Sequence, residues 1–236
     1  MTFADHLKEE AASYWEASYR HPFVTGIADG SLPLTNFRYY VLQDSYYLNQ
    51  FARVQSLGGA RSEDFYTTFR MAQHACGTYE AEHKLHEKFT KLLNITDEEK
   101  TNFRPSPTAY AYTSHLFRAA YNGHLGNIIA AILPCYWLYY DIGIRFQGAR
   151  PEEPIYQEWI QTYGTKWFKK LVDEQIVRLN VIAEQTGENE RRRMKENFLI
   201  SSYYELQFWE MAYRLENWNS SIMPEPVSSG NEVDPS

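Results

Sequence analysis

The segment 125–146, LGNIIAAILPCYWLYYDIGIRF, is nearly all apolar and decides the fold of this 236-residue chain. An apolar stretch of this length with no polar face is typical of a helix that is buried on all sides. Its most apolar part, residues 128–140, is too short to cross a lipid bilayer and contains Pro134. We therefore expect a central core helix, kinked at the proline, and no interaction with a membrane.

The sequence on both sides of this segment is also helical in its pattern. Apolar residues recur at intervals of three and four, and no run alternates with the period of a strand. The predicted fold class is all-α, a single-domain helical bundle over residues 1–218, and the polar, Pro-rich tail at 219–236 is expected to be disordered. The expected helices, with approximate ends, cover residues 3–19, 35–58, 62–93, 107–123, 125–146, 155–163, 166–185 and 189–218, with a short one after Thr96 and a loop at 26–33. The expected N-caps are Thr35, Ser62 and Thr96.

Charge and cysteine content restrict the partners and the location. A formal net charge of −7 and a pI near 5.5 oppose a nucleic-acid surface, which needs clustered Lys and Arg. The first ten residues include Asp5, Lys8, Glu9 and Glu10, where a signal peptide would be apolar. Cys76 and Cys135 show neither a disulfide framework nor zinc-ligand spacing. We expect a cytoplasmic protein with reduced thiols that binds no nucleic acid.

Aromatic residues make up 16% of the chain, and 19 residues are Tyr. A tyrosine combines an apolar ring with a hydrogen-bonding hydroxyl, so tyrosines line pockets for flat polar ligands as readily as they fill cores. For any single tyrosine, a place in a large helical core is the more common outcome. The surplus therefore leaves a padded core and a ligand pocket both open.

Cys135 lies in the middle of the apolar segment, directly after Pro134 and four residues before Tyr139, so the thiol and the tyrosine share a helix face. The proline removes a backbone hydrogen bond and opens the helix beside the thiol, as at sites where ligands approach. The alternative is a small, inert core residue, which is the more frequent role of a buried cysteine.

Asp44 lies in the aromatic-rich segment 39–47 and shares a helix face with Tyr47. A carboxylate on an inward face must be paired or hydrogen-bonded, because burying it alone costs several kcal/mol or drives its protonation. It can orient a ligand, or it can be the structural partner of Arg38 or Arg118.

Glu205 lies among the aromatic residues of segment 201–209. If it faces inward without a partner, its pKa should be raised, and a raised pKa suits general acid–base catalysis near neutral pH. If it points outward instead, it lies beside Arg214 or Lys195, and the helical period alone leaves both orientations open.

One short pattern resembles a metal-binding motif. Glu80 and His83 have the E-x-x-H spacing of helical di-iron proteins, and His86 follows on the same face. That chemistry needs a second E-x-x-H, which the chain lacks, and charged residues surround the first. We therefore interpret the pattern as a solvated helix face and expect no metal.

Four segments together closely resemble the thiaminase II (TenA) family. They are YYVLQDSYYL at 39–48, PSPTAYAY at 105–112, LPCYWLYY at 133–140 and SSYYELQFW at 201–209. The resemblance spans nearly the whole chain, from His21 to about Trp218, and four motifs in the same order make it specific. It implies a heme-oxygenase-like helical fold, a homotetramer, and no heme, metal or other cofactor.

The resemblance also implies an aminopyrimidine aminohydrolase in thiamin salvage. Family members hydrolyse 4-amino-5-aminomethyl-2-methylpyrimidine to the hydroxymethylpyrimidine and also cleave thiamin, breaking a bond between the exocyclic methylene carbon and nitrogen. In the family's pattern the Cys135 position adds to a ring carbon, the Glu205 position protonates the adjacent ring nitrogen, and the Tyr47 position supports the thiol. The positions that match substrate contacts are Asp44, Tyr112, Tyr139, Tyr163 and Phe208.

Two other functions stay open on the sequence alone. A non-catalytic pyrimidine-binding or regulatory protein would bind the ring without converting it, and proteins resembling this family have been described as activators of secreted-enzyme production. A heme or di-iron oxygenase, suggested by the fold, would show an absorbance band or tightly bound iron.

Overall fold

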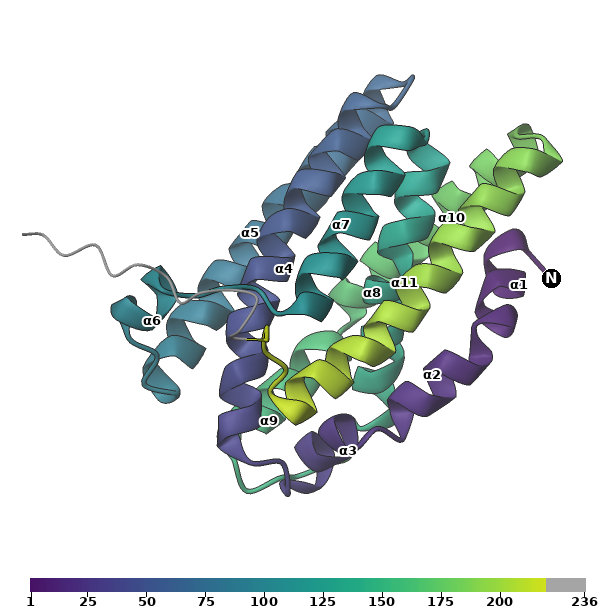
Figure 1. Cartoon of the computed structure of the whole chain (residues 1–236). Helices are drawn as coiled ribbons and strands as arrows, with labels where there is room; N and C mark the ends of the chain where they lie inside the picture. Colours follow the sequence, from purple (N-terminus) through teal and green to yellow (C-terminus); the bar gives the residue numbers. More distant parts are fainter. Residues whose placement is uncertain (220–236) are drawn as a thin grey trace, which may run out of the picture.

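The structure is a computed structural model that describes residues 1–219, apart from the side chains of residues 81–87. Every secondary-structure element in this part of the chain is a helix, which confirms the all-α prediction (Figure 1). The helices are α1 Phe3–Glu10, α2 Ala12–Tyr19, α3 Pro22–Asp29, α4 Leu34–Ala60, α5 Phe65–Leu92, α6 Asp97–Thr101, α7 Pro107–Asn122, α8 Leu125–Arg145, α9 Pro154–Tyr163, α10 Lys166–Gln185 and α11 Glu188–Arg214.

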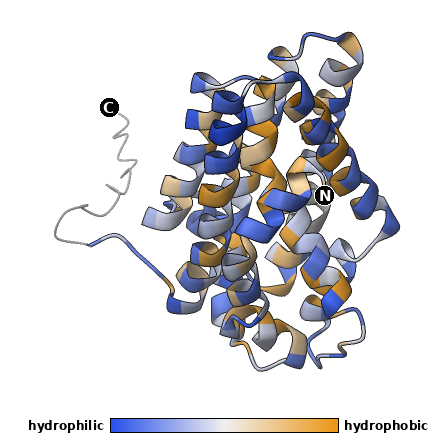
Figure 2. Cartoon of the chain, turned by 90° about the vertical axis from the view of Figure 1, so that its right-hand side faces the viewer, coloured by the Kyte–Doolittle hydropathy of each residue, from blue (hydrophilic) through white to orange (hydrophobic). Residues whose placement is uncertain are grey.

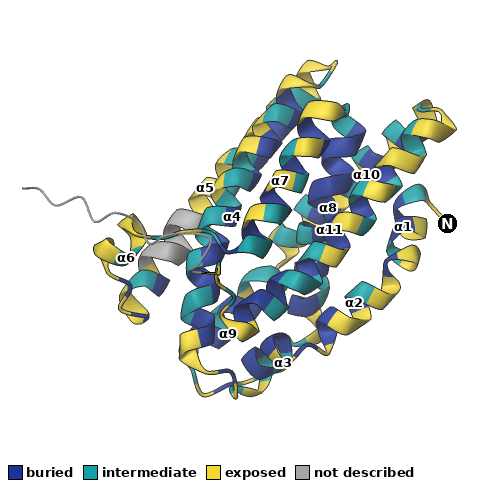
Figure 3. Cartoon of the chain, in the orientation of Figure 1, coloured by how far each residue is buried: buried dark blue, intermediate teal, exposed yellow. Residues whose placement is uncertain are grey.

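Helix α8 is the central element of the bundle. It packs against α4, α7, α9, α10 and α11, and its run from Ile128 to Pro134 is buried throughout (Figure 3). Among the described residues α8 is also the helix that is long and apolar enough to cross a membrane, but 78% of its apolar window is buried inside the fold. The burial confirms the prediction of a core helix.

The long helices α4, α5, α7, α8, α10 and α11 lie side by side, and α3 packs against α9 at one end of the bundle (Figure 1). Helices α1 and α2 run along the outside of α10 and α11. Figure 2 shows that hydrophilic and hydrophobic residues both recur along the helices on this side of the bundle, as expected for helices with one buried face. Large aromatic side chains fill the interior, and the fully buried ones include Trp15, Tyr40, Tyr112, Trp159 and Trp209. A large part of the aromatic surplus therefore packs the core.

The N-terminal helices differ from the expected single helix at 3–19 followed by a loop at 26–33. The chain turns at Ala11, which separates α1 from α2, and residues 22–29 form the additional helix α3. Pro22 starts this helix because its missing N–H falls on the first turn, where no intrahelical acceptor is needed. The His21 ring accepts a hydrogen bond from the Phe23 N–H, and Gly30, with φ 82°, ends the helix.

Two predicted N-caps are wrong by a residue or two. Helix α4 begins at Leu34 after Pro33, so Thr35 lies inside the first turn and does not cap it. Helix α5 is capped by Asp64, whose carboxylate accepts from the Thr67 N–H at 2.7 Å, rather than by Ser62. Asp and Ser are both good caps, and the sequence between residues 61 and 65 offers both.

The remaining boundaries agree closely with the prediction. Thr96 and Glu99 form the expected capping box of α6, and Ser106 precedes Pro107 at the start of α7. Helix α11 ends at Arg214 instead of about 218, because Leu215 adopts a left-handed conformation with φ 54°. The tail predicted at 219–236 lies outside the described residues, apart from its first residue.

Candidate active site

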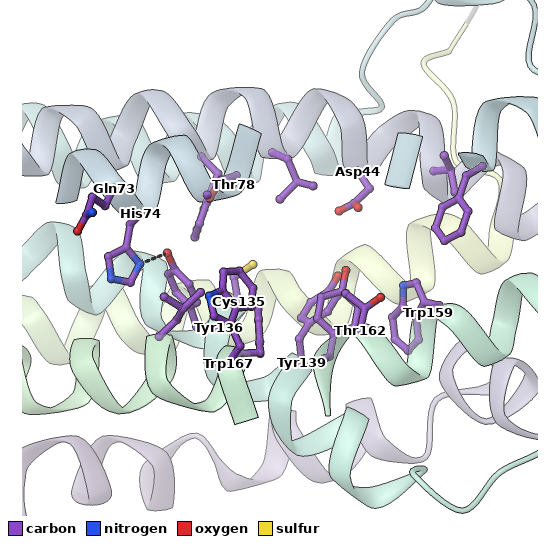
Figure 4. Close-up of a pocket in the computed structure, with 18 of the residues that line it drawn as sticks. Asp44, Gln73, His74, Thr78, Cys135, Tyr136, Tyr139, Trp159, Thr162 and Trp167 are labelled. Atoms are coloured by element: carbon purple, nitrogen blue, oxygen red, sulfur yellow. Dashed lines mark hydrogen bonds between the residues drawn. The ribbon is translucent and has the colours of Figure 1, made fainter. Parts of the chain in front are cut away.

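A cavity of about 290 Å3 lies between α4, α5, α8, α9 and α10. This size suits a small ring compound rather than a large cofactor. Aromatic rings form most of its wall, and a few polar side chains point into it (Figure 4). The polar and reactive groups include Asp44 on α4, Arg70, Gln73, His74 and Thr78 on α5, Cys135 and Tyr136 on α8, and Thr162 on α9.

Cys135 lies in the wall of the cavity, between the end that contains Asp44 and the end that contains His74 (Figure 4). Its thiol is free, and the residue is only partly buried because it faces the cavity. Burial of the thiol, together with the nearby Glu205 carboxyl, raises its pKa well above the usual value, while the Tyr47 hydroxyl beside it lowers it. In the absence of ligand the sulfur is therefore a thiol rather than a thiolate.

Asp44 forms the polar point at one end of the cavity. The residue is 9% exposed. Burial of Tyr40 and Tyr163 raises the pKa of both hydroxyls, and the negative charge of Asp44 raises it further. Its carboxylate thus lies close to these tyrosine hydroxyls. The structural partner considered for it, Arg38, forms an ion pair with Glu99 at 2.5 Å instead.

Glu205 faces inward from α11. The side chain is 2% exposed and accepts a hydrogen bond of 2.6 Å from the Tyr112 hydroxyl. Burial raises the pKa of Glu205 to about 8, with the Tyr112 hydrogen bond acting in the opposite direction. The outward alternative is wrong, because Arg214 pairs with Glu210 and Lys195 pairs with Glu10.

The eight residues singled out in the sequence divide into two groups in space. Four of them line the cavity: Asp44, Cys135, Tyr139 and Tyr163. The other four form a layer next to Cys135, defined by Tyr47, Tyr112, Glu205 and Phe208, and do not line the cavity in this conformation.

Within this layer the rings are in direct contact. Tyr47 lies 4.9 Å from Tyr112 and 5.7 Å from Phe208, centroid to centroid. The Tyr47 hydroxyl is buried without a hydrogen bond of standard geometry, between the Cys135 thiol and the Tyr112 hydroxyl. The layer thus connects the Cys135 thiol to the Glu205 carboxyl through two phenols.

The cavity also contains residues that the sequence patterns did not single out. Tyr136 follows Cys135 directly, and its position alone could have marked it. His74 lies on α5 in the segment MAQHACG, where an isolated histidine carries no motif. Trp159 and Phe168 add rings to the wall from α9 and α10. These residues reach the cavity through helix packing, which local spacing does not encode.

The described residues contain no group of three His, Cys, Asp or Glu side chains close enough to hold a metal ion. Glu80 is exposed on α5, whereas the side chains of His83 and His86 lie outside the described residues. The predicted solvated face can therefore be seen only at its first residue.

Comparison with known proteins agrees with the geometry. The model of the TENA/THI-4/PQQC family matches residues 8–215. An aminopyrimidine aminohydrolase of Bacillus subtilis is 55% identical over 230 residues, which cover 98% of this chain and 98% of that protein. A TenA homologue from P. horikoshii superposes with a TM-score of 0.82 at 28% identity, covering 91% of this chain and 99% of that one.

A more distant structure supports the predicted fold type. A domain of unknown function from Shewanella denitrificans with a heme oxygenase-like fold superposes with a TM-score of 0.70, at 15% identity, over 90% of this chain and 92% of that one. At this identity the likeness concerns the fold alone, and it confirms the heme-oxygenase-like architecture.

Proposed function

The chain belongs to the TENA/THI-4/PQQC family, and on that premise we propose that it is an aminopyrimidine aminohydrolase. It hydrolyses the C–N bond at the exocyclic methylene carbon of a 4-aminopyrimidine. The observation that carries this proposal is the cavity itself, in which a free thiol and a carboxylate face each other's space among aromatic rings, with the buried acid Glu205 in the layer next to the thiol. The 55% identity to a protein named for this activity adds to it.

Asp44 and its neighbouring tyrosines are the proposed binding site for the pyrimidine ring. The carboxylate accepts hydrogen bonds from the 4-amino group or from a protonated ring nitrogen, which fixes the orientation of the ring. Tyr139 and Tyr163, whose centroids are 4.8 Å apart, supply the aromatic wall for the flat heterocycle. Tyr112 and Phe208, expected substrate contacts, act in this proposal from the layer beside Cys135.

Cys135 is the proposed nucleophile. Its sulfur adds to the ring carbon next to a ring nitrogen, and Glu205, protonated at neutral pH because of its raised pKa, gives its proton to that nitrogen. Covalent addition removes the aromaticity of the ring, so that the ring electrons can expel the group on the methylene carbon. Direct displacement by water at this carbon would be slow.

Two residues of the layer, Tyr47 and Tyr112, supply the path for the thiol proton. As Glu205 protonates the ring, Tyr112 passes its proton to the carboxylate across the 2.6 Å hydrogen bond. Tyr47 then passes its proton to Tyr112, and the Cys135 thiol passes its proton to Tyr47. The net change moves the thiol proton to the ring nitrogen and leaves Glu205 and both phenols neutral, so no unpaired charge is created in the buried layer.

The second half of the reaction replaces the leaving group by water. Expulsion of the amine, or of the thiazole when thiamin is the substrate, leaves an exocyclic double bond at the methylene carbon. Water adds there, the C–S bond breaks to restore the aromatic ring, and the proton of the ring nitrogen returns through Glu205, Tyr112 and Tyr47 to the departing sulfur, which becomes the thiol again. The aminomethylpyrimidine and thiamin are the proposed substrates, and the hydroxymethylpyrimidine product places the enzyme in thiamin salvage.

Mixing the purified protein with either substrate and separating the products by chromatography tests this function. Formation of the hydroxymethylpyrimidine is expected. Tight pyrimidine binding in calorimetry without any product would instead favour the regulatory alternative.

We also propose a cytoplasmic homotetramer. Large apolar side chains are exposed on the outer face of α5, among them Phe65, Tyr66, Phe69 and Tyr79, and such patches commonly mark protein interfaces. Light scattering should give a mass four times the 27.8 kDa of one chain. A mass of one chain at micromolar concentration would contradict the proposal.

A further inference from the structure

The cavity continues past Cys135 to a second group of polar side chains that the mechanism above does not use. His74 and Thr78 line this end from α5, and Tyr136 lines it from α8 (Figure 4). The mouth of the cavity lies on this side, because Gln73 and Trp167 both line the cavity and are exposed. Water and the departing amine therefore pass these residues, whereas the ring held by Asp44 lies deeper.

The hydrogen bonds around Tyr136 run in one direction. Thr78 donates to the Gln55 amide oxygen at 3.0 Å, which leaves the Gln55 NH2 group to donate to the Tyr136 oxygen at 2.5 Å. The Tyr136 hydroxyl then has its own hydrogen to give to His74 Nδ1, which lies 2.9 Å away. The Tyr136 oxygen keeps one acceptor position for a further donor.

His74 connects Tyr136 to a carboxylate. Its Nε2 is buried, makes no hydrogen bond of standard geometry, and lies 3.4 Å from the Glu174 carboxylate on α10. Burial alone would raise the pKa of Glu174, but hydrogen bonds from Arg70 and Arg178, together with the nearby His74, bring it well below its usual value. Glu174 is therefore an anion at neutral pH, placed to stabilise a positive charge on the imidazole.

We propose that Tyr136 is a further catalytic residue, which removes a proton from the attacking water, with His74 and Glu174 as the positioning residues that receive and stabilise that proton. The proposal rests on the aminohydrolase function. As the water oxygen forms its bond to the methylene carbon, its proton moves to the Tyr136 oxygen, and the Tyr136 proton moves to His74 Nδ1. The electron pair of the exocyclic double bond returns to the ring.

The proton balance of the whole reaction has a place for such a base. The path through Tyr47 and Tyr112 leaves Glu205 protonated after the thiol has added, so Glu205 cannot take the proton of the water. The ammonium group of the aminomethylpyrimidine leaves as ammonia, and His74 returns the proton to it, which gives ammonium and the alcohol. With thiamin, the thiazolium leaves as neutral thiazole, and His74 releases the proton to the solvent. Both sides of Cys135 are then back in their starting states.

The test compares Tyr136→Phe and His74→Gln with Tyr140→Phe, a tyrosine of the same helix that does not line the cavity. We expect kcat to fall about 10²-fold or more in the first two, within the range of general-base catalysis, with KM changing much less. With thiamin in a rapid-quench experiment, one thiazole per active site should be released quickly, followed by slow formation of the hydroxymethylpyrimidine. Added mercaptoethanol, which attacks as a thiolate and needs no base, should restore turnover.

Several outcomes overturn the proposal. Wild-type kcat in both variants would do so, as would a loss of kcat without the rapid thiazole release and without rescue by the thiol, which would indicate a structural role. Circular dichroism and pyrimidine binding by calorimetry show whether each variant is folded. An inactive wild-type protein would overturn the proposed function and this inference with it, whereas an active wild type with unaffected variants overturns the inference alone.

Discussion

The two sides of Cys135 present the same residue type in opposite charge states. On one side Glu205 is buried beside phenol rings and accepts a hydrogen bond from Tyr112, and burial raises its pKa to about 8. On the other side Glu174 is half-buried but forms ion pairs with Arg70 and Arg178, and it is ionised. The surroundings rather than the residue type decide which carboxyl group is an acid and which is an anion.

This difference matches the order of the proposed steps. The addition step needs a proton donor beside the ring, and the protonated Glu205 supplies it. The water step needs a proton acceptor that stays available after Glu205 has been reprotonated, and the chain from Tyr136 to the Glu174 anion supplies it. The thiol between them takes part in both steps, so variants at these three points separate the two sides.

The largest effect is expected at the point that both sides share. Cys135→Ser should lower turnover by about 10³-fold or more, because the hydroxyl is a much weaker nucleophile in the same position. Cys76→Ser is the matched control, since Cys76 is exposed and does not line the cavity. Mass spectrometry of quenched reactions should detect a covalent adduct on the wild type only. Equal turnover by both variants would exclude the covalent mechanism.

The second largest effect is expected for Glu205→Gln, which keeps the shape of the side chain but cannot give up a proton. We expect kcat to fall about 10²–10³-fold while pyrimidine binding changes little. The pH profile provides a second measurement. Because the protonated form is the active one, wild-type kcat/KM should be high below pH 8 and fall as the pH rises through about 8.

In Glu205→Gln, the fall of kcat/KM above about pH 8, the alkaline limb of the profile, should disappear. Replacement of the exposed Glu196 by Gln on the same helix is the control, and it should leave the profile unchanged. Persistence of the same alkaline limb in Glu205→Gln would show that another group titrates there.

A smaller effect is expected on the other side of the thiol. Glu174→Gln removes the anion that faces His74 but leaves Tyr136 in contact with the water, so we expect kcat to fall about tenfold, less than the ~10²–10⁴ of a group that handles the proton directly. Asp173→Asn is the matched control, because Asp173 is exposed and its ion pair with Lys169 lies on the surface. A loss as large as that of Tyr136→Phe would mean that Glu174 itself acts on the substrate.

The sequence predicts one side of Cys135 much better than the other. Asp44, Cys135 and Glu205 lie in aromatic-rich segments with helical spacing. The local pattern therefore predicts that their side chains face inward and that burial perturbs the pKa of the two acids. The contact of His74 with Glu174 joins α5 to α10 across one hundred residues of sequence. The spacing of residues within either helix does not predict this contact.

The errors in the fold have a similar origin. Asp64 and Ser62 are both suitable caps, and the choice between them depends on how α4 and α5 pack, not on either side chain. Pro22 begins α3, and the first part of the loop expected at 26–33 is helical because Phe23 and Ile27 are buried on the core side of α3. Tertiary packing decided these positions.

The smallest effect concerns how densely the chain is packed at the mouth of the cavity compared with a helix contact that does not line it. Gly77 lies at the mouth on α5, and a methyl group added there would meet no atom within 4 Å. Gly77→Ala should therefore stabilise the helix by about 0.5–1 kcal/mol and raise Tm by about 1–4 °C, without slowing turnover of the aminomethylpyrimidine. Gly143→Ala is the contrasting variant, because the added carbon would lie 2.5 Å from the Gly164 backbone nitrogen and should lower Tm in a calorimetric scan. A lower Tm in Gly77→Ala would mean that the mouth is covered by something a single chain does not contain, such as another subunit.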